Sequence, residues 1–135
     1  MKKESVDYTE ALELKELGFD EPCFYQYVRD FDNDGELIPI ISETNHPILR
    51  DNNQVSLCSG GDCFAAPLKQ QAFRWFREKC LLEGTIEQAD DFYWYKFSVY
   101  FYGKENKQLL SKGLEFKTYE EAELACLKKL IEIVK

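Results

Sequence analysis

A helix-capping signal near the C-terminus constrains the fold more than any other feature of the chain. Thr118 and Glu121 stand in the Thr-x-x-Glu spacing, in which the hydroxyl accepts from the amide three residues on and the glutamate reaches back. The amphipathic pattern that follows predicts a helix over 118–134. Residues 92–102 alternate as a half-buried strand does, so the second half of the chain needs a sheet as well as helices.

The remaining C-terminal pattern completes an α+β arrangement. A helix is predicted over 66–82 with Pro67 in its first turn, where a missing amide hydrogen is harmless. Further strands are predicted near 85–87 and over 108–117. Residues 65–135 are therefore expected to form an antiparallel sheet with two helices packed on one face, in the order α-β-β-β-α.

The N-terminal segment, residues 1–41, is expected to add a helix and a β-hairpin. Asp7 and Glu10 suggest a capping pair at the start of a helix that ends at Leu17, and Gly18 supplies a left-handed residue after it. The turn at 32–35 separates predicted strands 24–31 and 36–41.

Pro39 places the second of these strands at a sheet edge, because it has no amide hydrogen to donate. Residues 42–64 lack a period and are predicted to be a long loop. We expect one domain over 1–135, in which the N-terminal elements extend or cover the free face of the C-terminal sheet.

Charge and cysteine content restrict the partners and the compartment. The net charge is −8, and residues 1–64 carry fourteen acidic against five basic residues. This excess of negative charge disfavours binding to nucleic acid and to anionic membranes. The acidic surface is either simply solvated or a docking face for a basic protein. No apolar run is long enough to span a membrane. Five cysteines, an odd number, are expected to be reduced thiols in a cytoplasmic protein.

The strand over 92–102 carries aromatic residues on both faces. One face is expected to be core, with Tyr93, Tyr95, Phe97, Val99 and Phe101. The other presents the candidate protein-binding residues Phe92, Trp94, Tyr100 and Tyr102. An aromatic surface of this size is either covered by other elements or used to bind a partner.

Two weak metal patterns occur. Asp30, Asp32 and Asp34 have the spacing that opens a calcium loop, but Ile41 occupies the position where such a loop needs a bidentate glutamate. The residues Cys23, His46, Cys58 and Cys63 include no closely spaced cysteine pair of the kind that structural zinc sites use. No metal or cofactor is therefore predicted.

Catalysis is a distant alternative. His46 is the only histidine, and with Cys58 or Cys63 it could form a thiol–imidazole pair. No local pattern orients such a pair, and no phosphate-binding glycine loop is present. The chain is not expected to be an enzyme.

Two resemblances add to this interpretation. Residues 14–23, 66–79 and 118–133 resemble a family of small, uncharacterised bacterial proteins often encoded near phage and mobile-element genes. That resemblance implies a cytoplasmic accessory protein and no known site. Residues 66–134 are similar to the double-stranded RNA-binding domain in the order of their elements, with Phe97-Ser98-Val99 and residues 118–123 matching its last hairpin and helix.

The RNA-binding residues of that domain do not carry over. It places paired lysines at the start of the last helix, where this chain has Tyr119 and Glu120 with Glu121 and Glu123 beside them, leaving only Lys117. We therefore expect a non-catalytic accessory or regulatory module that binds another protein. The alternative is nucleic-acid binding through Gln70, Arg74 and Arg77 on the helix over 66–82.

Overall fold

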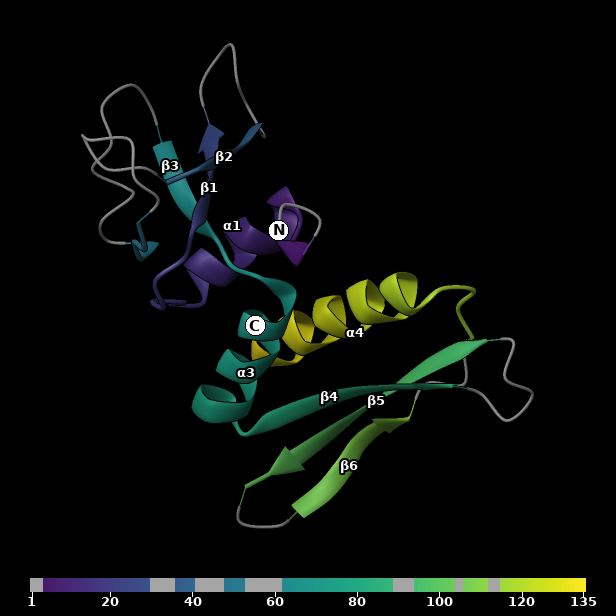
Figure 1. The fold of residues 1–135 in the computed structure, drawn as a ribbon. Helices are drawn as coiled ribbons and strands as arrows, with labels where there is room; N and C mark the ends of the chain where they lie inside the picture. The colour runs from purple at the N-terminus through teal and green to yellow at the C-terminus, as the bar shows by residue number, and fades with distance from the viewer. Residues whose placement is uncertain are drawn as a thin grey trace. The chain divides into compact units, whose positions relative to one another are not determined.

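The computed structural model has an α+β fold with two small antiparallel sheets (Figure 1). It describes residues 4–29, 36–40, 48–52, 62–88, 94–103, 106–111 and 115–135. The chain divides into two compact units, Met1–Ala72 and Phe73–Lys135, and the boundary lies inside one helix. The two units are described in turn.

The N-terminal unit contains a helix and a sheet with strand order β2-β1-β3. Its elements are α1 (Tyr8–Glu16), β1 (Tyr25–Arg29), β2 (Glu36–Pro39) and β3 (Asp62–Ala66). The predicted hairpin is confirmed, because β1 and β2 pair antiparallel with Tyr25 opposite Pro39. The position of β2 at the sheet edge is confirmed as well. The turn at 30–35 lies outside the described residues.

Helix α1 begins after Asp7 and ends before Gly18, as predicted, but it lacks the predicted capping pair. Gly18 has a φ of 95°, its amide donates to Lys15 O at 3.0 Å, and the Phe19 amide donates to Leu14 O at 2.9 Å. These two bonds form a Schellman motif and fold Phe19 back into the core. At the start, Asp7 makes no side-chain capping bond, so that prediction is wrong. The side chain of Glu10, the other member of the predicted pair, lies on the buried face of the helix with an exposed fraction of 2%.

Strand β3 corrects the predicted loop over 42–64 and excludes one of the two predicted placements of the hairpin. Residues 62–64, predicted as the end of a long loop, belong to this strand, and Cys63 and Phe64 are buried. The strand pairs antiparallel with β1, so the hairpin belongs to its own sheet and does not extend the C-terminal one. A five-residue strand next to Ser-Gly-Gly shows no alternation to detect, because its burial comes from a partner distant in sequence.

The C-terminal unit confirms the predicted order of elements. It comprises α3 (Lys69–Cys80, continuing from the first unit), β4 (Leu82–Gln88), β5 (Tyr95–Tyr102), β6 (Asn106–Ser111) and α4 (Tyr119–Val134). The sheet is antiparallel in the order β4-β5-β6. Helix α3 begins two residues after Pro67, and β6 ends earlier than predicted. Phe116 instead pairs with Tyr95 as an isolated bridge.

Both helices of this unit pack on one face of the sheet (Figure 1). A Cβ on Gly84 of β4 would lie 2.5 Å from Cys126 Sγ of α4 and 3.1 Å from the Phe73 ring of α3. Glycine is therefore required here so that both helices can approach the strand closely. Phe97 and Val99 of β5 are buried on the same face, as predicted, whereas Tyr95 and Phe101 are only half-buried and Tyr93 lies outside the described residues. The predicted N-cap is confirmed, since Thr118 Oγ1 accepts from the Glu121 amide at 3.1 Å.

Candidate functional site

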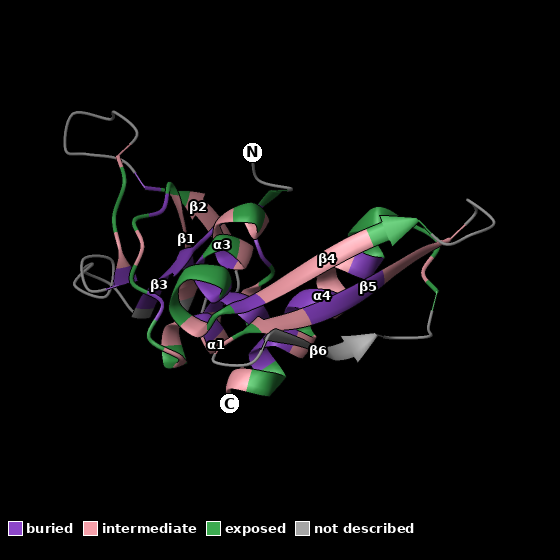
Figure 2. Ribbon diagram, turned by 90° about the horizontal axis from the view of Figure 1, so that it is seen from below, coloured by how far each residue is buried: buried purple, intermediate pink, exposed green. Residues whose placement is uncertain are grey.

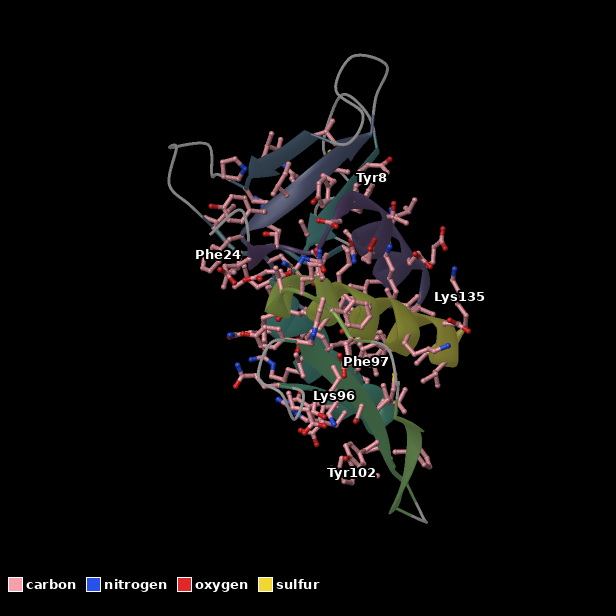
Figure 3. The ribbon with its side chains drawn as sticks, turned by 90° about the vertical axis from the view of Figure 1, so that its right-hand side faces the viewer. Tyr8, Phe24, Lys96, Phe97, Tyr102 and Lys135 are labelled. Carbon is pink, nitrogen blue, oxygen red and sulfur yellow. The ribbon has the colours of Figure 1, made fainter. Side chains whose placement is uncertain are left out.

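The face of the β4-β5-β6 sheet away from the helices carries the candidate surface. Because side chains alternate along a strand, Lys96, Tyr100 and Tyr102 project opposite to Phe97 and Val99. Figure 3 places Phe97 between the sheet and α4, and Tyr102 on the other side. In Figure 2, β4 is mostly half-buried and exposed, whereas β5 is buried in its middle and half-buried or exposed toward its ends. Across the pairing register, Glu83 lies opposite Tyr100 and Glu87 lies opposite Lys96.

Two tyrosines form the centre of this surface. The Tyr100 and Tyr102 rings stack with centroids 6.4 Å apart and planes inclined by 22°. Tyr102 remains 45% exposed. A side-chain hydrogen bond with Glu83 raises the pKa of Tyr102, with smaller contributions from burial and from the charge of Glu83. The phenol is therefore a neutral, accessible donor tied to a carboxylate on the neighbouring strand.

Leu81 adjoins these tyrosines and was not found from the sequence. It follows α3 directly, has a φ of 57° and is 45% exposed. Its carbonyl accepts a hydrogen bond from the Tyr102 amide at 2.8 Å, which places the two backbones side by side. A left-handed leucine is disfavoured by about 1–2 kcal/mol, and glycine is the usual residue at this position after a helix. The sequence pattern predicted a helix that continues to residue 82, which places Leu81 inside it. A predicted end at Cys80 would instead have placed Leu81 at the position where glycine is expected.

The four aromatic residues predicted for protein binding do not form one patch. Tyr100 and Tyr102 are neighbours, whereas Trp94 precedes β5 at the opposite end and is half-buried. The ends of an eight-residue strand lie roughly 24 Å apart. Phe92 lies outside the described residues. The candidate surface is therefore Leu81, Tyr100 and Tyr102 with Glu83, and it is called the tyrosine surface below.

The nucleic-acid candidates lie on α3, and the charge at α4 opposes them. Gln70, Arg74 and Arg77 are all exposed, as the helical pattern predicts. Arg77 Nη1 lies 4.0 Å from Glu83 Oε1, so this cation is already directed toward the tyrosine surface. The first turn of α4 presents Glu120 and Glu121, both exposed. Carboxylates at this helix start repel a phosphate backbone.

The cysteines described by the structure offer no activated thiol. Burial raises the pKa of Cys23 and of Cys126 to about 12, and burial also raises the pKa of Cys80. A thiol whose pKa is raised forms little of the nucleophilic thiolate. Cys63 is disulfide-bonded, so the prediction of reduced thiols is wrong at this residue. An odd cysteine count shows only that at least one thiol is unpaired.

The metal and catalytic candidates lie mostly outside the described residues. This applies to Asp30, Asp32, Asp34, His46 and Cys58. Within the described ranges, no three histidine, cysteine or acidic side chains are grouped as a metal site requires. The helices among the described residues are all too short or too polar to cross a membrane.

Comparison of the chain with protein-family models, with curated proteins and with solved structures gives no match. The interpretation of the tyrosine surface therefore depends on its own geometry and chemistry.

Proposed function

We propose that this protein is a non-catalytic accessory or regulatory module that binds another protein through the tyrosine surface. The observation that carries the proposal is Leu81, an exposed leucine in a left-handed conformation beside the exposed Tyr102. A left-handed conformation is disfavoured for leucine, and strained residues of this kind cluster at binding sites. Burial of its side chain by a partner would offset the cost of this conformation.

The composition of the surface supports a protein as the partner. Tyrosine offers a large apolar area and a hydroxyl while losing little conformational entropy, and it is enriched at protein interfaces. Tyr100 and Tyr102 already stack on each other and so are partly ordered before binding. By the family resemblance, the setting we propose is a bacterial or phage-derived system in the cytoplasm.

Nucleic-acid binding is the alternative, and one observation favours it. Gln70, Arg74 and Arg77 are exposed on α3, which precedes three strands and a helix as in the double-stranded RNA-binding domain. Against it stand the net charge of −8 and the exposed carboxylates that begin α4. Cysteine–histidine catalysis ranks below both, because Cys63 is held in a disulfide.

The test is quantitative affinity purification of the full chain from its native host, with and without nuclease, using two matched variants. Tyr102→Ala removes the exposed ring of the tyrosine surface, and Tyr119→Ala removes an aromatic ring of similar exposure on α4. We expect the Tyr102→Ala variant to lose its protein partner at least tenfold, because truncation of a central interface tyrosine costs about 2 kcal/mol or more. The Tyr119→Ala variant should retain it.

Two results would contradict the proposal. Equal recovery of partners with Tyr102→Ala and with the wild type would remove the tyrosine surface from the interface. Recovery that disappears after nuclease treatment, together with a salt-dependent mobility shift of duplex RNA, would replace the protein partner with nucleic acid.

A further inference from the structure

The β4 strand has an open edge next to the tyrosine surface. Among the described residues, β4 is hydrogen-bonded to β5 alone, so its outer amide and carbonyl groups can accept another strand. Exposed strand edges of this kind bind extended peptides by strand addition. β4 also carries Glu83, whose side chain hydrogen-bonds with Tyr102 of β5, so a strand added to the other side of β4 would contact the tyrosine surface through Glu83.

The side chains of β4 make this edge negatively charged. On the face away from the helices they are Glu83, Thr85 and Glu87, and the strand contains no basic residue. Residues two apart on a strand point to the same side, so both carboxylates flank the same face of any added strand. Opposite charges directly across a strand pair stabilise it, whereas like charges destabilise it.

This charge pattern disfavours a second copy of the chain. If two β4 strands paired antiparallel about Thr85, Glu83 of each copy would face Glu87 of the other. Two carboxylate pairs would then meet across the interface. An incoming strand with lysine or arginine at alternate positions would meet the same carboxylates as ion pairs.

We propose that the partner supplies an extended basic segment that adds to the β4 edge as a fourth strand. Its backbone pairs with β4, and its lysine or arginine side chains lie opposite Glu83 and Glu87. This inference depends on the proposed protein-binding function and identifies the chemistry of the partner. Glu83 joins the two parts of the site, because it lies at the edge and also hydrogen-bonds with Tyr102.

Arg77 acts as an internal competitor for the basic segment. Its guanidinium reaches Glu83 at 4.0 Å, the long limit of an ion pair, with side-chain exposures of 49% and 30%. An exposed pair of this length contributes little stability, so a partner's cation can replace it. Removal of Arg77 should therefore tighten binding of a basic segment, whereas it should weaken binding of a nucleic acid.

The experiment uses a fluorescein-labelled decapeptide that alternates lysine and threonine, titrated against the full chain at physiological salt by fluorescence anisotropy. We expect saturable binding, about tenfold weaker for Glu83→Gln/Glu87→Gln and severalfold tighter for Arg77→Gln. The control Glu115→Gln/Glu120→Gln removes the same charge from exposed residues outside the sheet and should bind as the wild type does. The same peptide with alternate N-methylated amides, which cannot pair with the edge, should bind at least tenfold more weakly.

Several outcomes would overturn the inference. The inference fails if the basic peptide does not saturate the protein at millimolar concentration, or if a glutamate–threonine peptide binds equally well. It also fails if both double variants lose the same affinity, or if the N-methylated peptide binds as tightly as the unmodified one. A wild-type dimer that cross-links through β4 would make a second copy the occupant. If partner recovery still depends on Tyr102 while these tests fail, protein binding stands and strand addition falls. If Tyr102→Ala has no effect, the proposed function itself fails.

Discussion

The two sheets of this protein differ in whether the outer backbone groups of their edge strands are blocked or free to pair. In the β2-β1-β3 sheet, Pro39 removes a donor from the β2 edge. At the β3 edge, the Ala65 amide donates to Asn52 Oδ1 at 2.8 Å, and the Asn52 amide group donates to Phe19 O at 2.8 Å. The β4 edge of the other sheet has no such closure among the described residues and carries two glutamates instead.

This difference indicates where a partner can bind. An edge closed by proline and by a buried asparagine cannot accept a strand without losing bonds that it already makes. A charged edge prevents pairing only with strands of like charge, and it remains open to strands of opposite charge. The comparison therefore favours the C-terminal sheet for the proposed association, and substitutions at either sheet can test this proposal.

The largest expected effect follows from opening the closed edge with Asn52→Ala. The substitution removes two hydrogen bonds and leaves the buried Ala65 amide and Phe19 carbonyl without those partners. We expect a loss of about 3 kcal/mol in the free energy of unfolding, measured by urea denaturation, and faster hydrogen exchange at the Ala65 amide. Asn52→Asp keeps the acceptor for Ala65 but turns a buried oxygen toward the Phe19 carbonyl, so it should not restore the stability. A loss below about 1 kcal/mol would show that Asn52 does not close this edge.

A smaller effect is expected on the helix-covered face of the open sheet. In Gly84→Ala the new methyl group would meet Cys126 Sγ at 2.5 Å and Leu130 Cδ1 at 3.2 Å, so the packed core must shift. We expect a loss of about 2 kcal/mol in the free energy of unfolding. Cys126→Ala removes the nearest atom and should recover part of this loss in the double variant, so a thermodynamic cycle measures the contact. Additive losses would contradict this account of Gly84.

Local signals in the sequence predicted much of the fold. The Thr118 cap, the Gly18 helix end and the edge position of Pro39 each depend on residues close in sequence, and all are confirmed. The order of the C-terminal elements followed from the same kind of pattern. Alternation in β5 correctly separated Phe97 and Val99 from the face that bears Tyr100 and Tyr102.

The features that the sequence did not reveal depend on distant partners. Strand β3 is buried because it pairs with β1, and Asn52 matters because it bridges two segments far apart in the chain. The open edge of β4 likewise depends on which strands pair, a property of topology that no short pattern records. The candidate site was therefore predictable as aromatic residues on a face, but not as a face bounded by an accessible edge.

The smallest expected change in stability, at Leu81, separates folding from binding. Leu81→Gly and Leu81→Ala both remove the exposed side chain, but only glycine adopts the positive φ without strain. We therefore expect the glycine variant to be more stable than the alanine variant by about 1 kcal/mol in urea denaturation. Both should lose the protein partner equally in affinity purification, because the side chain and not the backbone makes the contact. If the glycine variant retained the partner, the leucine would have no binding role, and its left-handed conformation would be only a consequence of how α3 turns into the open edge of the sheet.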